Sequence, residues 1–219
     1  VQDGLERCEQ LRVLLAFENN IESLPMKPLV NLKTLTQLDL SRNRLCSMEG
    51  FEVMVNLETL RLDDNCLSMV HGLGGCTRLQ ELSIAHQKPM AADGGEGGGE
   101  GEDAGIEVEF EGMSMMSIGS TLRVLDVSGC GLRSLLSLSD LRRLEVFRGT
   151  DNPILTLDDV VPALATWRSL QSVDLRRCPV SEDRHHVQSM IAVSGTLLRE
   201  ANGKEISGRQ REFIVRLEM

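Results

Sequence analysis

Leucine recurs along the chain at a fixed spacing, and this repeat constrains the possible folds more than any other feature. The segments Leu35–Leu45 and Leu57–Leu67 align without a gap: each reads LxxLxL, followed three positions later by Asn and two further on by Leu. The leading leucine is found at Leu11, Leu35, Leu57, Leu79, Leu122, Leu144 and Leu170, and three of the six steps between these positions are 22 residues. Such self-similarity predicts an array of stacked units.

The alternation inside each unit identifies it as a leucine-rich repeat. In LxxLxL the leucines point to one side and the residues between them to the other, as in a short strand, so successive units should stack their strands into one parallel sheet. A second apolar pair, such as Leu45 with Met48, returns the chain through a short helical turn. No unit can bury its own leucines, and stacking builds the core. We therefore predict an α/β solenoid with a curved parallel sheet on its concave side, short helical turns on its convex side and a C-terminal helical cap.

A single domain is expected to span residues 1–219, with repeats over about 1–180 and a cap over about 181–219. The step from Leu79 to Leu122 is 43 residues and contains an acidic, glycine-rich insert at about 90–112, which has eight acidic residues and no Lys or Arg. Such a composition cannot bury enough apolar surface to order itself, so we expect a flexible loop between two repeats. The cap should begin with a helix near Ser181, and a last helix should run from about Ser207 to Glu218.

A polar residue follows each predicted strand where the chain turns, and we expect it to be structural. Its amide can hydrogen-bond backbone groups of adjoining turns that would otherwise be buried without partners. Asn occupies the position four times and Cys twice, at Asn19, Asn43, Asn65, Asn152, Cys130 and Cys178. Cys8 and Cys76 fall at the convex core layer and are expected to be small buried hydrophobic residues.

The N-terminal edge of the sheet is predicted to lack cover. The residues expected to face outward on the first strand, Val13, Leu15 and Phe17, are apolar. An exposed apolar strand at a sheet edge invites pairing with another chain, so cover is expected either from upstream sequence or from a partner.

Composition and spacing weigh against several function classes. The insert accounts for −8 of the formal net charge of −10, so the rest of the chain lacks the basic field of a nucleic-acid-binding protein. No apolar run reaches the length of a membrane span, and the six cysteines lack zinc-site spacing, which fits thiols in a reducing cytoplasmic compartment. The four histidines have no nucleophile or ligand partner at usable spacing. We predict no enzyme, cofactor or metal site, with a hydrolase assembled across repeats as the remaining alternative.

The candidate functional surface is the outward-facing side of the strands. The residue between the fourth and sixth positions of the pattern forms a row across the sheet, and a second row flanks it where the strands end. Rigid concave surfaces of this kind hold protein partners in solenoid proteins. The predicted protein-binding residues are Leu15, Phe17, Asp39, Arg42, Arg61, Asp63, Asp126, Arg148, Asp174 and Arg176.

The repeat resembles the SDS22-like class of leucine-rich repeats, with a unit of 22 residues, an Asn and a closing apolar pair. The likeness is closer in the segments Leu79–Pro89, Asp151–Val160 and Asn202–Phe213, the last of which reads NGKEISGRQREF. Their order is similar to that of leucine-rich-repeat regulatory subunits of type 1 protein phosphatase. That resemblance implies a cytoskeletal adaptor that binds the phosphatase catalytic subunit and associates with microtubules at centrosomes, cilia or flagella.

Two readings of function follow from this resemblance. The first is a non-enzymatic scaffold that recruits or regulates type 1 phosphatase at microtubule structures. The second is a structural component of a ciliary axoneme, or of another tubulin-based organelle, that never engages phosphatase. One departure matters: the only Val-x-Phe of the kind many phosphatase regulators use for docking is Val108-Glu-Phe110, which acidic residues precede. Docking on the concave face, with phosphatase, tubulin or an axonemal protein as partner, is therefore expected.

Overall fold

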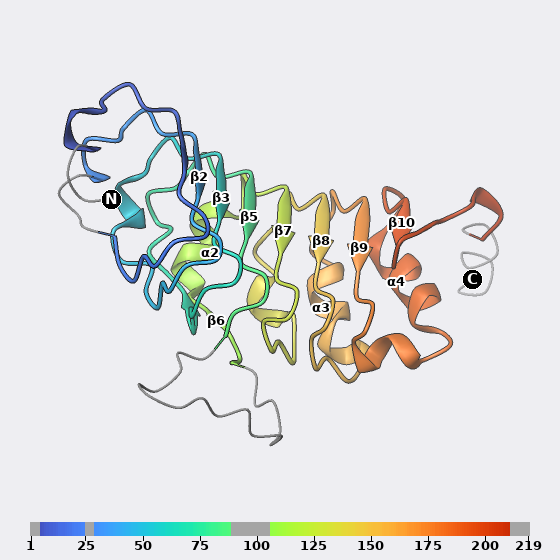
Figure 1. The fold of residues 1–219 in the computed structure, drawn as a ribbon. Coiled ribbons are helices and arrows are strands. Elements are labelled where there is room, and N and C mark those ends of the chain that lie inside the picture. Colours follow the sequence, from blue (N-terminus) through green and yellow to red (C-terminus); the bar gives the residue numbers. More distant parts are fainter. Residues whose placement is uncertain (1–4, 25–28, 89–105, 211–219) are drawn as a thin grey trace, which may run out of the picture.

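The computed structural model describes residues 5–24, 29–88 and 106–210, and in them the repeats form the predicted solenoid. Figure 1 shows the strands side by side along one face of the molecule and the helices α2, α3 and α4 along the other. Each repeat contributes one three-residue strand to the main sheet: β1 (Val13–Leu15), β2 (Gln37–Asp39), β3 (Thr59–Arg61), β5 (Glu81–Ser83), β7 (Val124–Asp126), β8 (Val146–Arg148) and β9 (Ser172–Asp174). All of these strands pair in parallel in the order of the sequence.

The convex side is made of short helical turns, because a unit of 22 residues leaves little chain for the return. They are η1 (Leu5–Arg7), η2 (Phe51–Val53), α2 (Gly112–Ile118), η3 (Leu136–Leu138), η4 (Leu157–Asp159), α3 (Val161–Leu164), η5 (Pro179–Glu182) and α4 (His186–Ser194). A small second sheet pairs β4 (Met69–Val70) with β6 (Glu109–Phe110).

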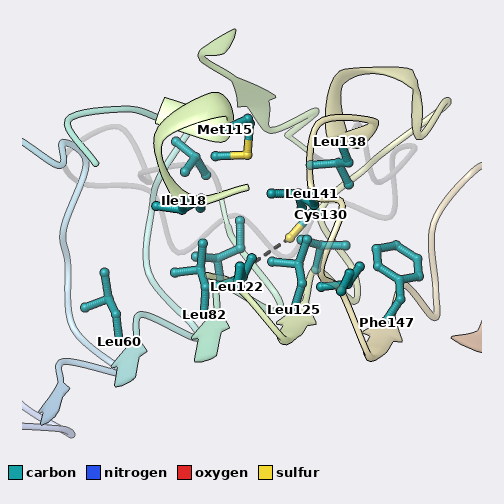
Figure 2. Packing of buried hydrophobic residues seen from close by; sticks show 14 of the residues in the cluster. Leu60, Leu82, Met115, Ile118, Leu122, Leu125, Cys130, Leu138, Leu141 and Phe147 are labelled. Carbon is teal, nitrogen blue, oxygen red and sulfur yellow. Dashed lines mark hydrogen bonds between the residues drawn. The ribbon is translucent and has the colours of Figure 1, made fainter. Parts of the chain in front are cut away.

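The core lies between the sheet and these turns and is built as the repeat predicts. The inward leucines of adjacent strands, Leu38, Leu60, Leu82 and Leu125, are buried and occupy matching register positions. Figure 2 shows Leu60, Leu82, Leu125 and Phe147 on successive strands, with Met115 and Ile118 of α2 packed from the convex side. Stacking therefore gives every unit a neighbour that removes its leucines from water.

The turn after each strand is held by the predicted side chain. Asn65 donates from Nδ2 to the carbonyls of Leu40 (3.0 Å) and Leu62 (2.9 Å) and accepts from the amide of Leu45 (3.0 Å). Asn43 and Asn152 repeat this arrangement, while among the described residues Asn19 bonds only carbonyls of its own turn. These bonds pair backbone groups that the solenoid would otherwise bury without partners.

Other side chains replace Asn in the remaining repeats. Gln87 makes the same three bonds, to Leu62, Ile84 and Leu67. The thiols of Cys130 and Cys178 each donate to a carbonyl of the preceding repeat at 3.1 Å. Cys130 and Cys76 are buried, and burial raises the pKa of each thiol to about 12, so both are poor nucleophiles.

The predicted insert is shorter than expected. The structure describes residues 106–112, which the sequence placed in the flexible loop: Val108 is 2% exposed, its amide donates to the carbonyl of Cys130, and β6 pairs with β4. The physical reason is the alternation of Ile106, Val108 and Phe110, which is a strand pattern that the neighbouring glycines and glutamates obscured. The part of the insert between residues 89 and 105 lies outside the described residues.

The sheet also continues past Val180, where the repeats were expected to end. After α4, Leu198 is fully buried and β10 (Glu200–Ala201) pairs in parallel with β9, before a hairpin to β11 (Lys204–Glu205). The cap is thus a helix followed by an eighth parallel strand, because Leu198-x-x-Ala201 reproduces the first half of the repeat. The expected helix from Ser207 to Glu218 falls largely outside the described residues.

Candidate functional site

The predicted central row of the concave face exists as one continuous line across the sheet. Each member is the last residue of its strand, and the strand register aligns all of them. The row runs Leu15, Asp39, Arg61, Ser83, Asp126, Arg148 and Asp174. These side chains lie opposite the buried leucines, so the surface they form is fixed by the core.

Most of the predicted basic side chains on this surface already have acidic partners within the chain. Arg61 forms an ion pair with Glu81 of the next strand at 2.8 Å, which keeps the pKa of Arg61 above its ordinary value. Arg42 pairs with Glu18, and Arg176 is bidentate on Asp174 (2.6 and 2.9 Å). A partner that used these residues would have to exchange existing contacts for new ones.

Arg148 differs from the other predicted arginines. It is exposed and, within the described residues, forms no side-chain hydrogen bond or ion pair. It lines a hollow of roughly 200 Å³ on the concave face together with Arg61, Asp63, Glu81, Ser83 and Asp126. An unpaired guanidinium beside a hollow can make bidentate bonds to an incoming carboxylate without breaking a bond of its own.

Asp63 serves the fold, although the sequence analysis placed it among the binding residues. Its carboxylate accepts hydrogen bonds from the Ser83 hydroxyl (2.6 Å) and the Ala85 amide (2.7 Å) of the next repeat. Burial raises the pKa of Asp63, while these two bonds oppose the rise. Asp39, Asp126 and Asp174 likewise accept a bond from a backbone amide two residues on.

The raised pKa of Asp63 gives a prediction for stability against pH. Because the folded state binds this proton more readily than the unfolded state, the contribution of Asp63 to the free energy of unfolding should fall as pH rises above 3.8 and become constant above the native pKa. Urea denaturation of wild type and Asp63→Asn between about pH 3 and pH 7 measures this. The free energy of unfolding of the variant, relative to that of the wild type, should rise with pH. A relative free energy that falls as pH rises would contradict the assignment.

The N-terminal end of the same face is apolar. Val13, Leu15 and Phe17 are 46%, 55% and 48% exposed, as the sequence predicted for the first strand. The concave face therefore has an apolar end at β1 and a mixed-charge centre at β3 to β8. That combination of an apolar patch with polar surroundings is characteristic of protein interaction surfaces.

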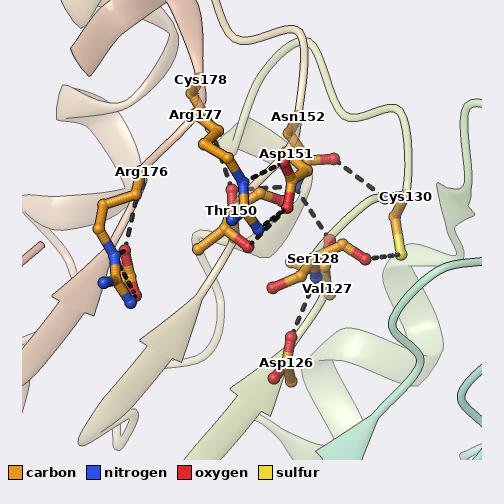
Figure 3. Close-up of polar contacts among 12 residues, drawn as sticks. Asp126, Val127, Ser128, Cys130, Thr150, Asp151, Asn152, Arg176, Arg177 and Cys178 are labelled. Atoms are coloured by element: carbon orange, nitrogen blue, oxygen red, sulfur yellow. Dashed lines mark hydrogen bonds and ion pairs between the residues drawn. The ribbon is translucent and has the colours of Figure 1, made fainter. Parts of the chain in front are cut away.

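A third row lies at the turn just beyond the strands; the sequence analysis named one of its residues, Arg42, but did not recognise the row. Its residues adopt a left-handed backbone: Glu18, Arg42, Asp64, His86, Asp151 and Arg177 all have φ between 52° and 61°. Asp151 and Arg177 pair across neighbouring repeats, as Figure 3 shows beside Asn152 and Arg176. The position directly before the Asn of the repeat makes the same turn in each of these units but varies in residue type, so only the repeat register could have revealed the row.

The described residues do not bring together a recognisable catalytic arrangement. No group of three or more His, Cys, Asp or Glu side chains that could hold a metal ion occurs among them. The Nε2 of His71 accepts from the Met48 amide, and the ring of His86 lies against the turn at Gly129. In the part of the chain that the structure covers, no helix is long and apolar enough to cross a membrane.

Comparison with known proteins supports the fold strongly and the function weakly. No family model matches the chain. Among solved structures, an internalin of Listeria monocytogenes is similar with a TM-score of 0.63 and 14% identity, over 92% of this chain and 50% of that one. Internalin C2 of the same organism is similar with a TM-score of 0.64 and 22% identity, over 90% and 74%.

A likeness in sequence is confined to a short segment. The mouse centrosomal protein of 72 kDa is 52% identical over 40 residues, which are 18% of this chain and 6% of that protein. The chain thus spans only a small part of this relative and half of the first internalin. The repeat, the parallel sheet and the internalin likeness together show that the chain has the leucine-rich-repeat fold.

Proposed function

We propose that the chain is a non-enzymatic scaffold that binds protein partners on its concave face. The observation that carries the proposal is the unpaired Arg148 beside the hollow, in a surface that the repeat core holds rigid. A preformed surface loses little conformational entropy on binding, which favours recognition of a folded partner. The exposed apolar end at Leu15 and Phe17 adds a patch that a partner can remove from water.

The proposed partner is type 1 protein phosphatase, and the proposed location is at microtubule structures. The proposal rests on the resemblance to the testis leucine-rich-repeat protein, regulatory subunit 42 of that phosphatase, and the short likeness to a centrosomal protein adds support for a cytoplasmic, centrosomal or ciliary location. The segment Val108–Phe110 is a poor docking motif, because Val108 is buried and Phe110 lies in β6. The concave face is therefore the surface proposed for the catalytic subunit.

The second candidate function is a structural role in a tubulin-based organelle, without phosphatase. The same 40-residue likeness favours it, since that relative is named for the centrosome and not for a phosphatase. The two candidates differ in one measurable respect, which is whether the purified chain binds the phosphatase catalytic subunit or tubulin.

Charge reversal at Arg148 tests the proposal. Arg148→Glu should weaken binding of the phosphatase catalytic subunit, measured by calorimetry, by roughly tenfold or more, about 1.4 kcal/mol, because lost contacts and new repulsion act together. The matched control Arg44→Glu reverses a charge at another exposed residue and should leave the affinity unchanged. Tubulin binding that depends on Arg148, without phosphatase binding, would favour the second candidate. If Arg148→Glu binds both proteins as tightly as the wild type does, recognition by the concave face is contradicted.

A further inference from the structure

The edge where the chain enters the strands carries a separate row of basic side chains. Successive backbone bonds define this edge: the amides of Arg123, Glu145, Gln171 and Arg199 donate to the carbonyls of Gln80, Arg123, Glu145 and Gln171. Six exposed arginines lie on it, in the fourth to seventh repeats and the cap. We call them the arginine rim: Arg78, Arg123, Arg142, Arg143, Arg168 and Arg199.

Five of these six arginines are available to an incoming group. Arg123 pairs with Glu145 at 2.9 Å, but the other five form no side-chain hydrogen bond or ion pair with any described residue. Six acidic residues lie within four positions of the leading leucines of this stretch. Asp126 and Asp174 belong to the concave row and Glu81 pairs with Arg61, which leaves Asp140, Glu145 and Glu200 on the edge beside the six arginines. The rim therefore concentrates positive charge on a chain whose formal net charge is −10.

Part of the rim lines a hollow of roughly 350 Å³ that extends from the third to the sixth repeat. Arg78, Arg123 and Arg143 line it, with the hydroxyl-bearing residues Thr77, Ser120 and Thr121 and one acidic residue, Glu58. The three guanidinium groups can only donate, so they favour an acceptor in the hollow, while the hydroxyls can donate or accept and that of Thr121 already donates to the carbonyl of Ile118. Arg is the side chain best suited to bidentate bonds with oxyanions.

We propose that the arginine rim binds an acidic, extended segment of a partner protein, with a carboxylate seated in the hollow. The spacing favours a run of carboxylates over a single phosphoryl group, because Arg168 and Arg199 lie beyond the hollow and extend the positive charge along the seventh repeat and the cap. Strands stack about 4.8 Å apart, so the rim from Arg78 to Arg199 spans about 19 Å, the length of about six extended residues. This surface is separate from the concave row, so it stands or falls independently of the proposed function.

Binding of a fluorescent peptide of six glutamates, followed by anisotropy, tests the proposal on the full chain. Arg78→Gln with Arg143→Gln removes two unpaired guanidinium groups from the hollow, and both side chains are exposed, so the fold should be preserved. Arg44→Gln with Arg184→Gln removes the same charge from exposed positions elsewhere. The rim variant should lose roughly tenfold or more in affinity and the control variant less than about twofold. Wild-type binding should weaken as salt is added.

Several results would overturn the proposal. Absence of binding at low salt to both the wild type and a variant with Asp93, Glu96, Glu100, Glu102 and Asp103 changed to amides, or equal losses in the rim and control variants, would show that the rim is not a specific site. If a phosphoserine peptide of equal charge binds tenfold more tightly, the rim recognises a phosphorylated segment and not a run of carboxylates. Binding that arises only after Asp93, Glu96, Glu100, Glu102 and Asp103 are changed to amides would identify the chain's own acidic run as the occupant.

Discussion

Replacing Asn65 by alanine should lower the free energy of unfolding by about 3 kcal/mol. The change removes every bond that Asn65 makes and leaves the buried amide of Leu45 without its partner, while the carbonyls of Leu40 and Leu62 keep the bonds donated by Asn43 and Gln87. Each buried group left unsatisfied costs about 1–3 kcal/mol, which is much more than the net gain from an average hydrogen bond. Urea denaturation of the purified chain measures the loss.

Asn19→Ala is the matched control for this change. Asn19 holds the same repeat position but is exposed, and in the part of the chain that the structure describes it bonds only the carbonyls of Ala16 and Phe17 in its own turn. Because water can replace those bonds, the control should cost less than about 1 kcal/mol. Equal losses in the two variants would mean that the amide does not connect neighbouring repeats as described.

Leu125→Ala should cost about 2–5 kcal/mol, because it leaves a cavity between stacked units. Leu125 is completely buried and lies in register between Leu82 and Phe147. Leu136→Ala offers a matched control in the same repeat, since that leucine is 64% exposed on η3. An unchanged denaturation midpoint for Leu125→Ala, or a loss as large for Leu136→Ala, would overturn the assignment of Leu125 to the core.

The solenoid could be predicted because the leucines of every repeat have the same role, which is to form the core. Leu38, Leu60 and Leu82 must face inward at the same register, so their spacing determines both the strand position and the sheet order. The role of Asn65 followed for a similar reason, since buried backbone groups require a partner at one fixed place in the turn. Because every unit packs in the same way, such a fold can be predicted from a single sequence.

Other features depend on contacts that spacing does not encode. The strand Glu109–Phe110 was missed because only three apolar residues mark it, and its partner Met69–Val70 is 40 residues earlier. The pairing of Arg61 with Glu81 and the internal bonds of Asp63 depend on side-chain positions in the next repeat. The sequence therefore placed the concave row correctly but could not distinguish paired residues from Arg148.

Hydroxyl-radical footprinting of the chain bound to the phosphatase catalytic subunit tests concave-face recognition most directly. Oxidation of the exposed concave residues Leu15 and Phe17 should slow on binding, because a partner seated on that face excludes solvent from them. Met113 and Met116 are 70% and 62% exposed on α2 of the convex side and serve as internal controls whose oxidation should not change. Protection of Met113 and Met116 with Leu15 and Phe17 unchanged would place the partner on the convex side and contradict the proposal.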